Sequence, residues 1–381
     1  MKLLYVQDKM HNYAGMERIL SAKMNYLAEK SNHKVFFTTY EQQNKELPFK
    51  LSDNVIYIPI NTPIAKREQY TFTKWIPAFI KTRNLFRTNF YSLVKEINPD
   101  LIICTVYTFS VLDIIVKSSL FYNKKIVIES HTKASTILMS NKFQYNKLIY
   151  HVIKRWDNHI LKQLKYTSCI VTLTQADTKF WKKYANRVEV IPNMITILPH
   201  IVSNYNSKQI ISVGRYSYEK GYDMLLRAWS IVIKKLPEWK LYIYGNGDAS
   251  EYISIIKHYK LQESVFCMPA TKDIVSEYTK SSIYVMSSRY EGFGLVLTEA
   301  MSCGLPCISF DCPYGPSEII KDGEDGYLVE KNNINMFAEK MEILMNNLAL
   351  RSQMGMKAQV NVNRYNIDNV MKKWIDLFDK I

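Results

Sequence analysis

Short runs rich in β-branched and aromatic residues alternate with longer helical patterns along the whole 381-residue chain. Parallel strands need a crossover segment between them, and that segment is usually a helix. The alternation therefore predicts two α/β sheets in tandem. The expected strands are Lys2–Val6, Lys34–Thr38, Val55–Pro59, Leu101–Thr105, Lys125–Glu129, Cys169–Leu173, Val188–Ile191, Gln209–Val213, Lys240–Tyr244, Val265–Met268, Ile283–Met286 and Cys307–Phe310.

The length of the chain exceeds what one hydrophobic core usually supports, so two domains are expected. A polar segment without a clear hydrophobic period, residues 199–207, lies between the two groups of strands. We place a first domain at residues 1–203 and a second at residues 204–362. Residues 363–381 are predicted to form a C-terminal helix that packs back on the first domain.

No segment is apolar enough to predict a membrane span or a signal peptide. The most apolar candidate, Phe109–Phe121, is short and is interrupted by Asp113 and Lys117. The apolar start of the chain ends at Gln7 and Asp8, and no signal-peptide core follows. These features predict a cytoplasmic protein.

The six cysteines are predicted to be structural. Three of them lie in apolar, strand-like runs, where cysteine usually acts as a small buried hydrophobe. The other three, Cys303, Cys307 and Cys312, form no CxxC pair and have no histidine nearby. We therefore expect no metal site.

The positive charge of the chain is confined to its first half. Residues 1–200 hold 29 Lys and Arg against 14 Asp and Glu, whereas residues 201–381 hold 21 of each. In the densest basic region, residues 66–87, cations are interleaved with aromatic residues, as in helices that lie on anionic lipid headgroups. An ordinary amphipathic helix with a solvated basic face explains the pattern equally well. We recognise no DNA- or RNA-binding module and expect no nucleic-acid partner.

The strongest chemical signal is the segment Glu291-Gly-Phe-Gly-Leu-Val-Leu-Thr-Glu299, which follows a buried strand and opens a helix. Its glycines, Gly292 and Gly294, allow the backbone to approach a ligand, and the free N–H groups at the helix start favour an anion or a hydroxyl. The two glutamates can reach one ligand from two sides. Stabilisation of the helix dipole would explain one glutamate but not the whole frame.

A second candidate site follows the strand that begins at Gln209. The segment contains Gly214, Arg215 and Lys220, so a glycine turn delivers two cations to the carboxyl end of a strand, where α/β sheets bind ligands. Arginine offers a fork of donors to phosphate oxygens and lysine a point charge. Such a pair can neutralise a diphosphate without a divalent metal. Alone, a surface turn with solvated charges would be a common alternative.

Taken in this order, Arg215, Lys220, Glu291 and Glu299 resemble the retaining GT-B glycosyltransferases of family 4. The similarity is clearest over residues 209–330. It implies a GT-B fold, in which two Rossmann-like domains face each other across a cleft. It also implies a nucleotide-sugar donor, retention of the anomeric configuration and no requirement for a metal or other cofactor.

The resemblance also implies roles for individual residues. Arg215 and Lys220 would hold the diphosphate of the nucleotide, and Glu299 would bind the ribose hydroxyls. Glu291, with the amides of Phe293 to Leu295, would bind the donor sugar and stabilise charge there. The expected nucleotide-sugar site comprises Gly15, Gly214, Arg215, Lys220, Glu291, Gly292, Phe293, Gly294, Leu295 and Glu299.

The first domain matches the family pattern less closely. Ala14 replaces the first glycine of the family's Gly-Gly pair, but Gly15 can still bring its loop close to the phosphates. His131 follows an expected strand and resembles the family's histidine that approaches the donor sugar, so we include it among the catalytic candidates with Glu291, Arg215 and Lys220. Asn193 resembles the asparagine of a PNG turn and is a weaker candidate for contact with the acceptor.

The leading functional hypothesis is a hexosyl or N-acetylhexosaminyl transferase that moves a sugar from a UDP donor to a hydroxyl of a glycan. The run of residues 309–320 resembles bacterial enzymes that build surface polysaccharide on a polyprenyl diphosphate. The basic half would then bring the protein to the inner face of an anionic membrane. The alternatives are another GT-B enzyme, such as a phosphorylase or an epimerase, or a basic membrane- or nucleic-acid-binding protein with a relic sugar site.

Overall fold

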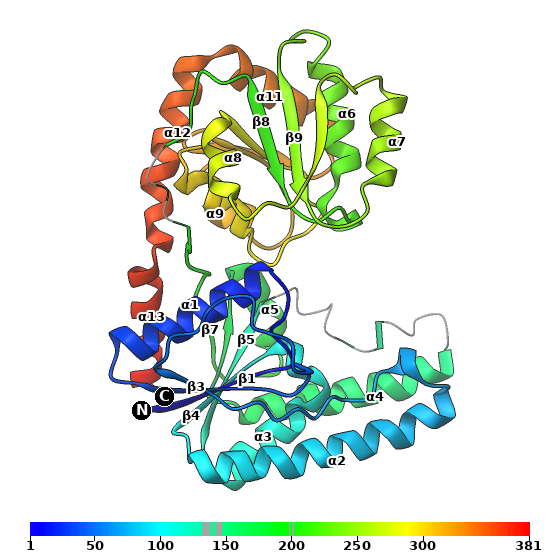
Figure 1. Cartoon of the computed structure of the whole chain (residues 1–381), viewed down its shortest axis with the longest axis vertical. Coiled ribbons are helices and arrows are strands. Elements are labelled where there is room, and N and C mark those ends of the chain that lie inside the picture. The colour runs from blue at the N-terminus through cyan, green and yellow to red at the C-terminus, as the bar shows by residue number, and fades with distance from the viewer. Residues whose placement is uncertain (132–137, 139, 142–146, 198, 200–201) are drawn as a thin grey trace. The chain divides into compact units, whose positions relative to one another are not determined.

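A computed structural model describes residues 1–131, 138, 140–141, 147–197, 199 and 202–381 of the chain (Figure 1). These residues form two compact units. The first comprises Met1–Ile191 together with Met371–Ile381, and the second comprises Pro192–Val370. The division thus falls after Ile191, whereas the sequence pattern places it after residue 203.

The first unit is built on a parallel sheet of seven strands, in the order β3-β2-β1-β4-β5-β6-β7. Successive side chains of these apolar strands point to opposite faces, so both faces of the sheet are buried. The strands are β1 (Lys2–Gln7), β2 (Lys34–Thr39), β3 (Val55–Tyr57), β4 (Leu101–Thr105), β5 (Lys125–Ser130), β6 (Cys169–Thr172) and β7 (Val188–Val190).

Helices cover both faces of this sheet. In one hydrophobic core, every second residue of the central strands packs against side chains from three helices. These side chains include Phe86 and Phe90 of α2, Ile115 of α3 and Ile160 of α4, all of them fully buried. The C-terminal residues of the chain return to this unit, where Trp374 packs against α1. The helices are α1 (Gly15–Lys30), α2 (Phe72–Ile97), α3 (Leu112–Phe121), α4 (Lys147–Gln163) and α5 (Gln175–Trp181). A further helix, α13 (Ile367–Asp379), begins in the last residues of the second unit and continues into the first.

The second unit contains a six-stranded parallel sheet in the order β10-β9-β8-β11-β12-β13. Its strands are β8 (Gln209–Val213), β9 (Lys240–Gly245), β10 (Val265–Pro269), β11 (Ile283–Met286), β12 (Cys307–Asp311) and β13 (Gly326–Glu330). Its helices are α6 (Tyr222–Val232), α7 (Ser250–His258), α8 (Ile274–Lys280), α9 (Leu295–Ser302), α10 (Pro316–Ile319), α11 (Ile334–Asn346) and α12 (Leu348–Val362). Trp229, Trp239, Phe310 and Phe337 fill its core.

The twelve strands predicted from the sequence are confirmed, with ends that differ by at most two residues. Strand β13 was not predicted, because its apolar run Tyr-Leu-Val is only three residues long. In both sheets the strand order reverses direction beside the first strand, between β1 and β4 and between β8 and β11. Such switch points leave a crevice at the carboxyl ends of the strands, where α/β sheets bind ligands.

The six cysteines are free thiols and five of them are buried. Burial raises the pKa of Cys104 to about 12 and that of Cys169 to about 11. In the part of the chain that the structure describes, no group of three or more His, Cys, Asp or Glu residues is placed to hold a metal ion. Among the described helices, none has both the length and the apolarity that crossing a bilayer requires.

Candidate active site

The switch point of the second unit brings together the two segments that the sequence singled out. The segment Gly214–Lys220 follows β8, and the segment Ser287–Gly294 follows β11, the strand that pairs with β8 in parallel. The two segments therefore leave the same edge of the sheet side by side. Residues about 70 positions apart in sequence thus form one cluster.

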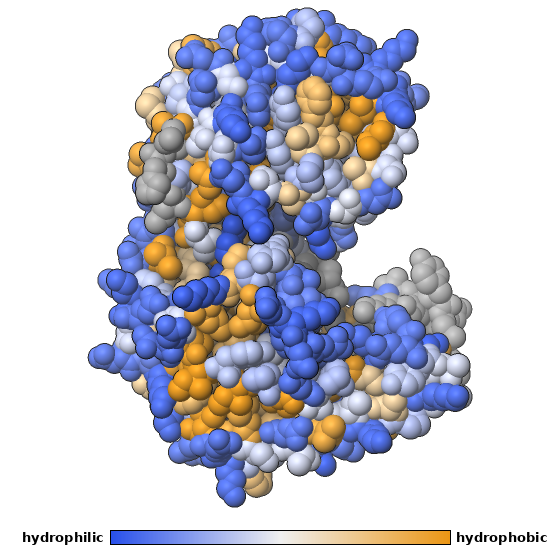
Figure 2. Space-filling view, in the orientation of Figure 1, coloured by the Kyte–Doolittle hydropathy of each residue, from blue (hydrophilic) through white to orange (hydrophobic). Residues whose placement is uncertain are grey.

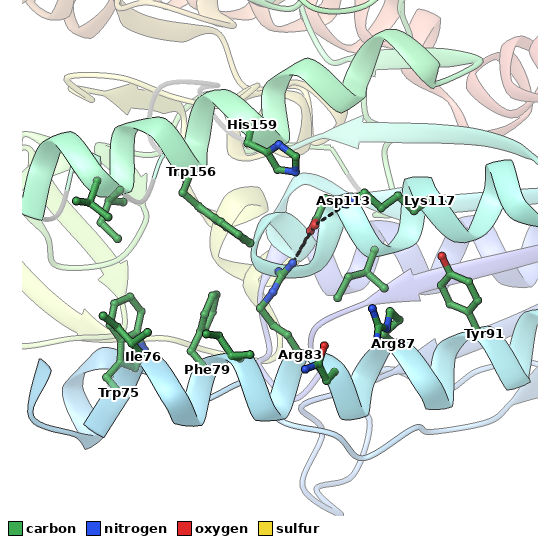
Figure 3. A pocket seen from close by; sticks show the side chains of 15 residues that line it. Trp75, Ile76, Phe79, Arg83, Arg87, Tyr91, Asp113, Lys117, Trp156 and His159 are labelled. Carbon is green, nitrogen blue, oxygen red and sulfur yellow. Dashed lines mark hydrogen bonds and ion pairs between the residues drawn. The ribbon is translucent and has the colours of Figure 1, made fainter. Parts of the chain in front are cut away.

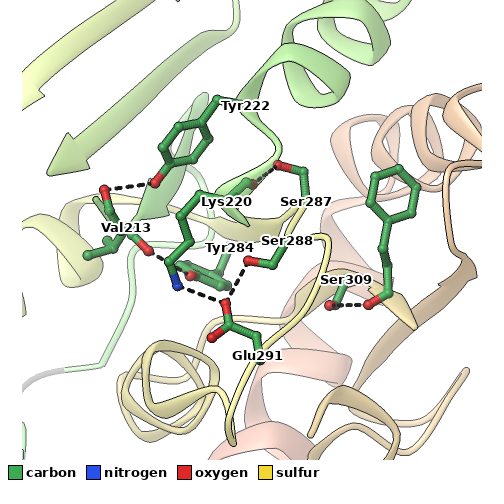
Figure 4. A network of polar contacts seen from close by, with 10 residues as sticks. Val213, Lys220, Tyr222, Tyr284, Ser287, Ser288, Glu291 and Ser309 are labelled. Carbon is green, nitrogen blue, oxygen red and sulfur yellow. Dashed lines mark hydrogen bonds and ion pairs between the residues drawn. The ribbon is translucent and has the colours of Figure 1, made fainter. Parts of the chain in front are cut away.

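The centre of this cluster is the pair formed by Lys220 and Glu291 (Figure 4). The Lys220 ammonium donates to Oε1 of Glu291 at 2.7 Å, and the Ser288 hydroxyl donates to the same oxygen at 2.6 Å. The two charged side chains are 17% and 12% exposed. A charge-assisted hydrogen bond in such a partly dry setting is stronger than one on the surface, and it fixes both side chains in position.

Lys220 is positioned by the backbone that surrounds it. The Ser287 hydroxyl donates to the carbonyl oxygen of Lys220 at 2.9 Å. The next residue, Gly221, has a φ of +62° and begins α6, and a Cβ there would lie 2.2 Å from the carbonyl oxygen of Ser287. Only glycine fits this close approach of two loops in a left-handed conformation. Gly221 therefore allows the two loops to approach closely enough for Lys220 to reach Glu291.

The turn after β8 is closed by backbone hydrogen bonds. The amide of Gly214 donates to the carbonyl oxygen of Tyr244 at 2.9 Å, and the Tyr222 hydroxyl donates to the carbonyl oxygen of Gly214 at 3.0 Å. Arg215 follows directly and is exposed to solvent. The turn thus leaves one cation, Arg215, exposed at the surface and holds the other, Lys220, in an ion pair.

The loop after β11 leads into α9 through the residues predicted to bind the donor. Gly292 is half-buried, Phe293 is buried, and Gly294 caps α9 with a φ of +100° and no side-chain cap. The first amide groups of α9, beginning at Leu295, lack partners within the helix, as at any helix start. Anions and hydroxyl oxygens are favourable ligands for such amides.

The second glutamate of the frame, Glu299, lies on α9 and is 4% exposed. The Tyr278 hydroxyl donates to its Oε2 at 3.4 Å. Eight residues separate it from Glu291, yet one glutamate is in the loop before the helix and the other is on the helix itself. The structure thus brings Lys220 and Glu291 into contact at the switch point and places Glu299 on the helix that follows the Glu291 loop. That the three residues form one ligand site stays a prediction.

An arginine that the sequence did not single out ties the two segments together. Arg289 makes a bidentate ion pair with Asp223 at 2.8 and 2.6 Å, and its guanidinium lies 4.0 Å from the ring centroid of Tyr218. Its backbone amide also donates to the carbonyl oxygen of Glu219 at 2.7 Å. Arg289 thus holds the segment that carries Arg215 and Lys220 against the segment that carries Glu291.

In the first unit, Gly15 lies in the connection after β1 and His131 directly follows β5. Gly15 is the first residue of α1. The Nε2 atom of His131 lies 3.0 Å from Oε2 of Glu129, and the ammonium of Lys23 donates to the same carboxylate oxygen. Lys23 and Glu129 are almost completely buried. His131 is thus held by a buried ion pair whose two charges come from α1 and β5.

The charges of this buried pair decide the ionisation of Glu129. Burial alone would raise the pKa of its carboxyl, but Lys23 and His131 outweigh that effect and lower the pKa. Burial lowers the pKa of Lys23, although Glu129 favours the charged ammonium. The carboxylate is therefore the stable form beside His131.

Asn193, the weaker candidate, belongs to the second unit and is 7% exposed. The residue that replaces glycine in the PNG turn, Met194, is also buried. Its proposed contact with the acceptor stays a prediction.

Comparison with known proteins bears first on the second unit. Residues 195–360 match the family described as glycosyl transferases group 1. Over this range the second unit is similar to that family. All members of the Lys220–Glu291 cluster lie inside the matched range.

Two relatives among proteins of known sequence carry glycosyltransferase names. An uncharacterized glycosyltransferase of Haemophilus influenzae is 36% identical over 219 residues, which cover 56% of this chain and 62% of that protein. The amylovoran biosynthesis glycosyltransferase AmsD of Erwinia amylovora is 27% identical in an alignment of 391 residues that covers 99% of both proteins. The chain thus spans less than two thirds of the first relative and nearly all of the second.

Solved structures extend the likeness to the whole chain. A variant of TarM from S. aureus, in complex with fondaparinux, alpha-GlcNAc-glycerol and UDP, has a TM-score of 0.73 at 17% identity. The comparison covers 99% of this chain and all of that one. At this identity the likeness shows the fold alone. It confirms the GT-B class, with two Rossmann-like units, that the sequence predicts.

Sequence reasoning missed residues that support the candidate sites in each of the two units. Ser288 and Tyr222 carry no signal in sequence, because their hydrogen bonds depend on where the chain returns. Lys23 could have been found, since it occupies a position on α1 where Leu20, Met24 and Leu27 define a buried stripe. A lysine on such a stripe predicts a buried partner of opposite charge.

Proposed function

We propose that the chain is a retaining glycosyltransferase of family 4 that transfers a hexose or an N-acetylhexosamine from a UDP-sugar to a hydroxyl of a glycan. The group 1 domain and the named relatives support the transferase activity. The AmsD relative is named for amylovoran biosynthesis, which favours a role in bacterial polysaccharide biosynthesis. UDP is favoured as the nucleotide because the similar TarM structure holds it.

The observation that carries this proposal is the Lys220–Glu291 pair at the switch point of the second unit. A nucleoside diphosphate competes with Glu291 for the Lys220 ammonium, and Arg215 is free to swing toward the same phosphates because it is exposed. Both cations then stabilise the charge that develops on the leaving diphosphate. These residues can do this without a divalent metal, and we propose no cofactor.

In the transfer, the bond between the anomeric carbon and the UDP oxygen breaks, and a bond from that carbon to the acceptor oxygen forms. The acceptor hydroxyl loses its proton to the departing diphosphate. Once Lys220 has turned to the phosphates, the Glu291 carboxylate is available to the sugar hydroxyls and to the positive charge that develops on the sugar. We assign it this positioning and charge-stabilising role, and not that of a nucleophile.

The remaining residues complete the proposed donor site. Glu299 lies on the helix that starts in the donor loop, and its carboxylate suits the paired hydroxyls of ribose. The loop from Gly292 to Leu295 offers backbone amides. Gly15 and His131, in the first unit, are proposed to contact the donor, with His131 held by Glu129.

The acceptor is proposed to be a glycan on a polyprenyl diphosphate at the inner face of the cell membrane. The excess of cations in residues 1–200 supports contact with an anionic surface, because clustered Lys and Arg are attracted to anionic lipids. The protein would then be cytoplasmic and peripheral to the membrane.

A product assay tests the proposal. The purified chain is incubated in EDTA with UDP-glucose, UDP-galactose or UDP-N-acetylglucosamine and a synthetic polyprenyl-diphosphate monosaccharide. Mass spectrometry should show the gain of one sugar, and the anomeric proton coupling of the product should match that of the donor. Glu291→Gln should lower kcat by about 10²–10³-fold, as loss of a transition-state stabiliser does.

The matched control is Glu263→Gln, which removes the charge of an exposed glutamate in the same unit and should leave turnover unchanged. Sugar release that depends on inorganic phosphate would indicate a phosphorylase instead, and turnover without acceptor would indicate an epimerase. Absence of any turnover, together with binding of vesicles or nucleic acid, would favour the binding-protein alternative.

A further inference from the structure

A cavity of about 450 Å³ lies in the first unit, apart from the residues assigned to the donor (Figure 3). Side chains from α2 form one wall, and those from α3 and α4 form the other. Its size falls within the range of about 300–1,000 Å³ that small-molecule sites occupy. All of the residues that line it belong to one compact unit.

The interior of this groove is apolar and aromatic. Trp75 and Phe79 of α2 point toward Trp156 of α4. At its mouth, Ile80 of α2 is 54% exposed and Val152 of α4 is 55% exposed. Large aliphatic side chains that gather around an open apolar cavity indicate an interaction site rather than ordinary scatter.

A nearly buried ion pair at the floor of the groove neutralises its own charge. The Nη2 atom of Arg83 donates to both carboxylate oxygens of Asp113 at 2.8 and 2.9 Å, and the guanidinium lies 4.5 Å from the ring centroid of Trp156. Both charged side chains are nearly buried. The pair therefore closes the floor of the groove and leaves no net charge for a ligand there.

The rim of the groove is cationic. Arg87 of α2 and Lys117 of α3 line it and are exposed, and the Lys117 ammonium is 3.8 Å from Asp113, which Arg83 already neutralises. Further exposed cations on the two long helices are Lys74, Lys81, Lys154 and Arg155. Figure 2 shows hydrophilic and apolar side chains interleaved over α2.

The apolar surface continues beyond the rim. Leu120 and Phe121, at the end of α3, are 50% and 72% exposed, and the ring of Phe121 packs beside that of Tyr91 in the groove wall. Exposed aliphatic and aromatic residues interspersed with Lys and Arg are the composition that suits an anionic lipid surface. A nucleic acid would contact only the cations, and the apolar cavity would remain empty.

We propose that this groove binds one hydrocarbon chain of an anionic, phosphate-headed membrane lipid, with the phosphate at Arg87 and Lys117. The apolar cavity and the cationic rim match the two ends of such a molecule. This inference rests on the membrane contact in the proposed function and makes it specific. It is independent of glycosyl transfer.

The tryptophans of the groove provide a direct probe. Trp75 and Trp156 line it, whereas the other four, Trp181, Trp229, Trp239 and Trp374, are at most 3% exposed and lie elsewhere. Vesicles of phosphatidylglycerol brominated in the acyl chain quench tryptophan fluorescence only at short range. Wild-type fluorescence should fall on titration with these vesicles, and vesicles of brominated phosphatidylcholine should quench far less.

A negative charge introduced at the mouth tests the location. Ile80→Glu and Val152→Glu place a carboxylate at exposed positions, so folding is preserved, and each should abolish the quenching. Val360→Glu is the matched control, because Val360 is 68% exposed on α12 of the other unit. The double variant Arg87→Glu/Lys117→Glu should weaken vesicle binding on the order of tenfold or more.

Three results would overturn the proposal. Vesicle sedimentation without bromine quenching would show contact by surface charge alone. Equal quenching by brominated phosphatidylcholine and phosphatidylglycerol would show that the cationic rim does not select an anionic headgroup. A change of oligomeric mass in Ile80→Glu, without lipid quenching in the wild type, would assign the groove to a second copy of the chain. Sugar transfer measured on Ile80→Glu with a detergent-soluble acceptor separates failure of the groove from failure of the proposed function.

Discussion

The buried pair of Lys23 and Glu129 gives the sharpest prediction for the stability of the first unit. Lys23→Met keeps the length and the apolar stem of the side chain but removes its charge. Glu129 stays buried, and of its two hydrogen-bonding partners among the described side chains only His131 remains. The Lys23 ammonium also lies 3.9 Å from the ring centroid of Trp374, and that cation–π contact is lost as well.

The size of the effect follows from the burial of both charges. Their side chains are 1% and 3% exposed, so water cannot replace the missing partner. Removing one member of such a pair costs about 3–5 kcal/mol of the free energy of unfolding. For a domain of this size that corresponds to a fall in Tm on the order of 10 °C.

The assay is urea unfolding, followed by far-UV circular dichroism, of the wild type, Lys23→Met and the double variant Lys23→Met/Glu129→Gln. The double variant should recover most of the loss, because no buried charge remains. The control Lys117→Met removes an exposed lysine and leaves Asp113 paired with Arg83. It should cost no more than about 0.5 kcal/mol.

The pH dependence of the free energy of unfolding gives a second test of this pair. In the wild type the pKa of Glu129 is lowered, so its contribution to stability is present at neutral pH and is lost as the pH falls through the folded pKa. In Lys23→Met the carboxyl loses its cation, its pKa rises above the unfolded value, and acid stabilises the variant. The gap between the two proteins should therefore narrow toward about pH 4.5. A loss below about 1 kcal/mol at pH 7 that stays constant with pH would refute this reasoning.

Two further predictions concern the backbone and a loop carboxyl. Gly315→Ala should disturb the donor loop and weaken UDP binding, because a Cβ there would lie 1.9 Å from the carbonyl oxygen of Phe293 at a φ of +136°. The control is Gly323→Ala, whose Cβ meets nothing within 4 Å. This variant should bind UDP with normal affinity in calorimetry. Burial raises the pKa of Asp8 to about 7, so its effect on stability is favourable in acid and is lost as the pH rises from about 4 to 7. Asp8→Asn should therefore stabilise the protein on the order of 1 kcal/mol at pH 8 and little at pH 5 in thermal unfolding, and a gain that did not depend on pH would contradict this.

Much of the fold was available from sequence because local patterns determine it. Short apolar runs located twelve of the thirteen strands found among the described residues, and the glycine-rich segments after two of them indicated Lys220 and Glu291. Their meeting could be predicted only because neighbouring parallel strands end at one edge of the sheet. The local pattern also shows why β13 escaped, since three apolar residues between polar ones resemble a loop.

What sequence could not supply are contacts between segments distant in the chain. Lys23 and Glu129 are 106 positions apart, and nothing near either residue identifies the other. Arg289 and Asp223 are likewise joined only by the return of the chain. The cavity between α2 and α4 depends on how two helices pack, whereas the sequence showed only that the basic region 66–87 is rich in aromatic residues.

In the proposed function, the cluster around Lys220, Glu291 and Glu299 binds a nucleoside diphosphate without metal. Isothermal titration of the purified chain with UDP in EDTA tests it most directly. Saturable binding is predicted, weakened about tenfold to a hundredfold in Glu299→Gln by the loss of a charged hydrogen-bond acceptor and unchanged in Glu263→Gln. Absence of binding at millimolar UDP, or equal affinity in wild type and Glu299→Gln, would contradict the account.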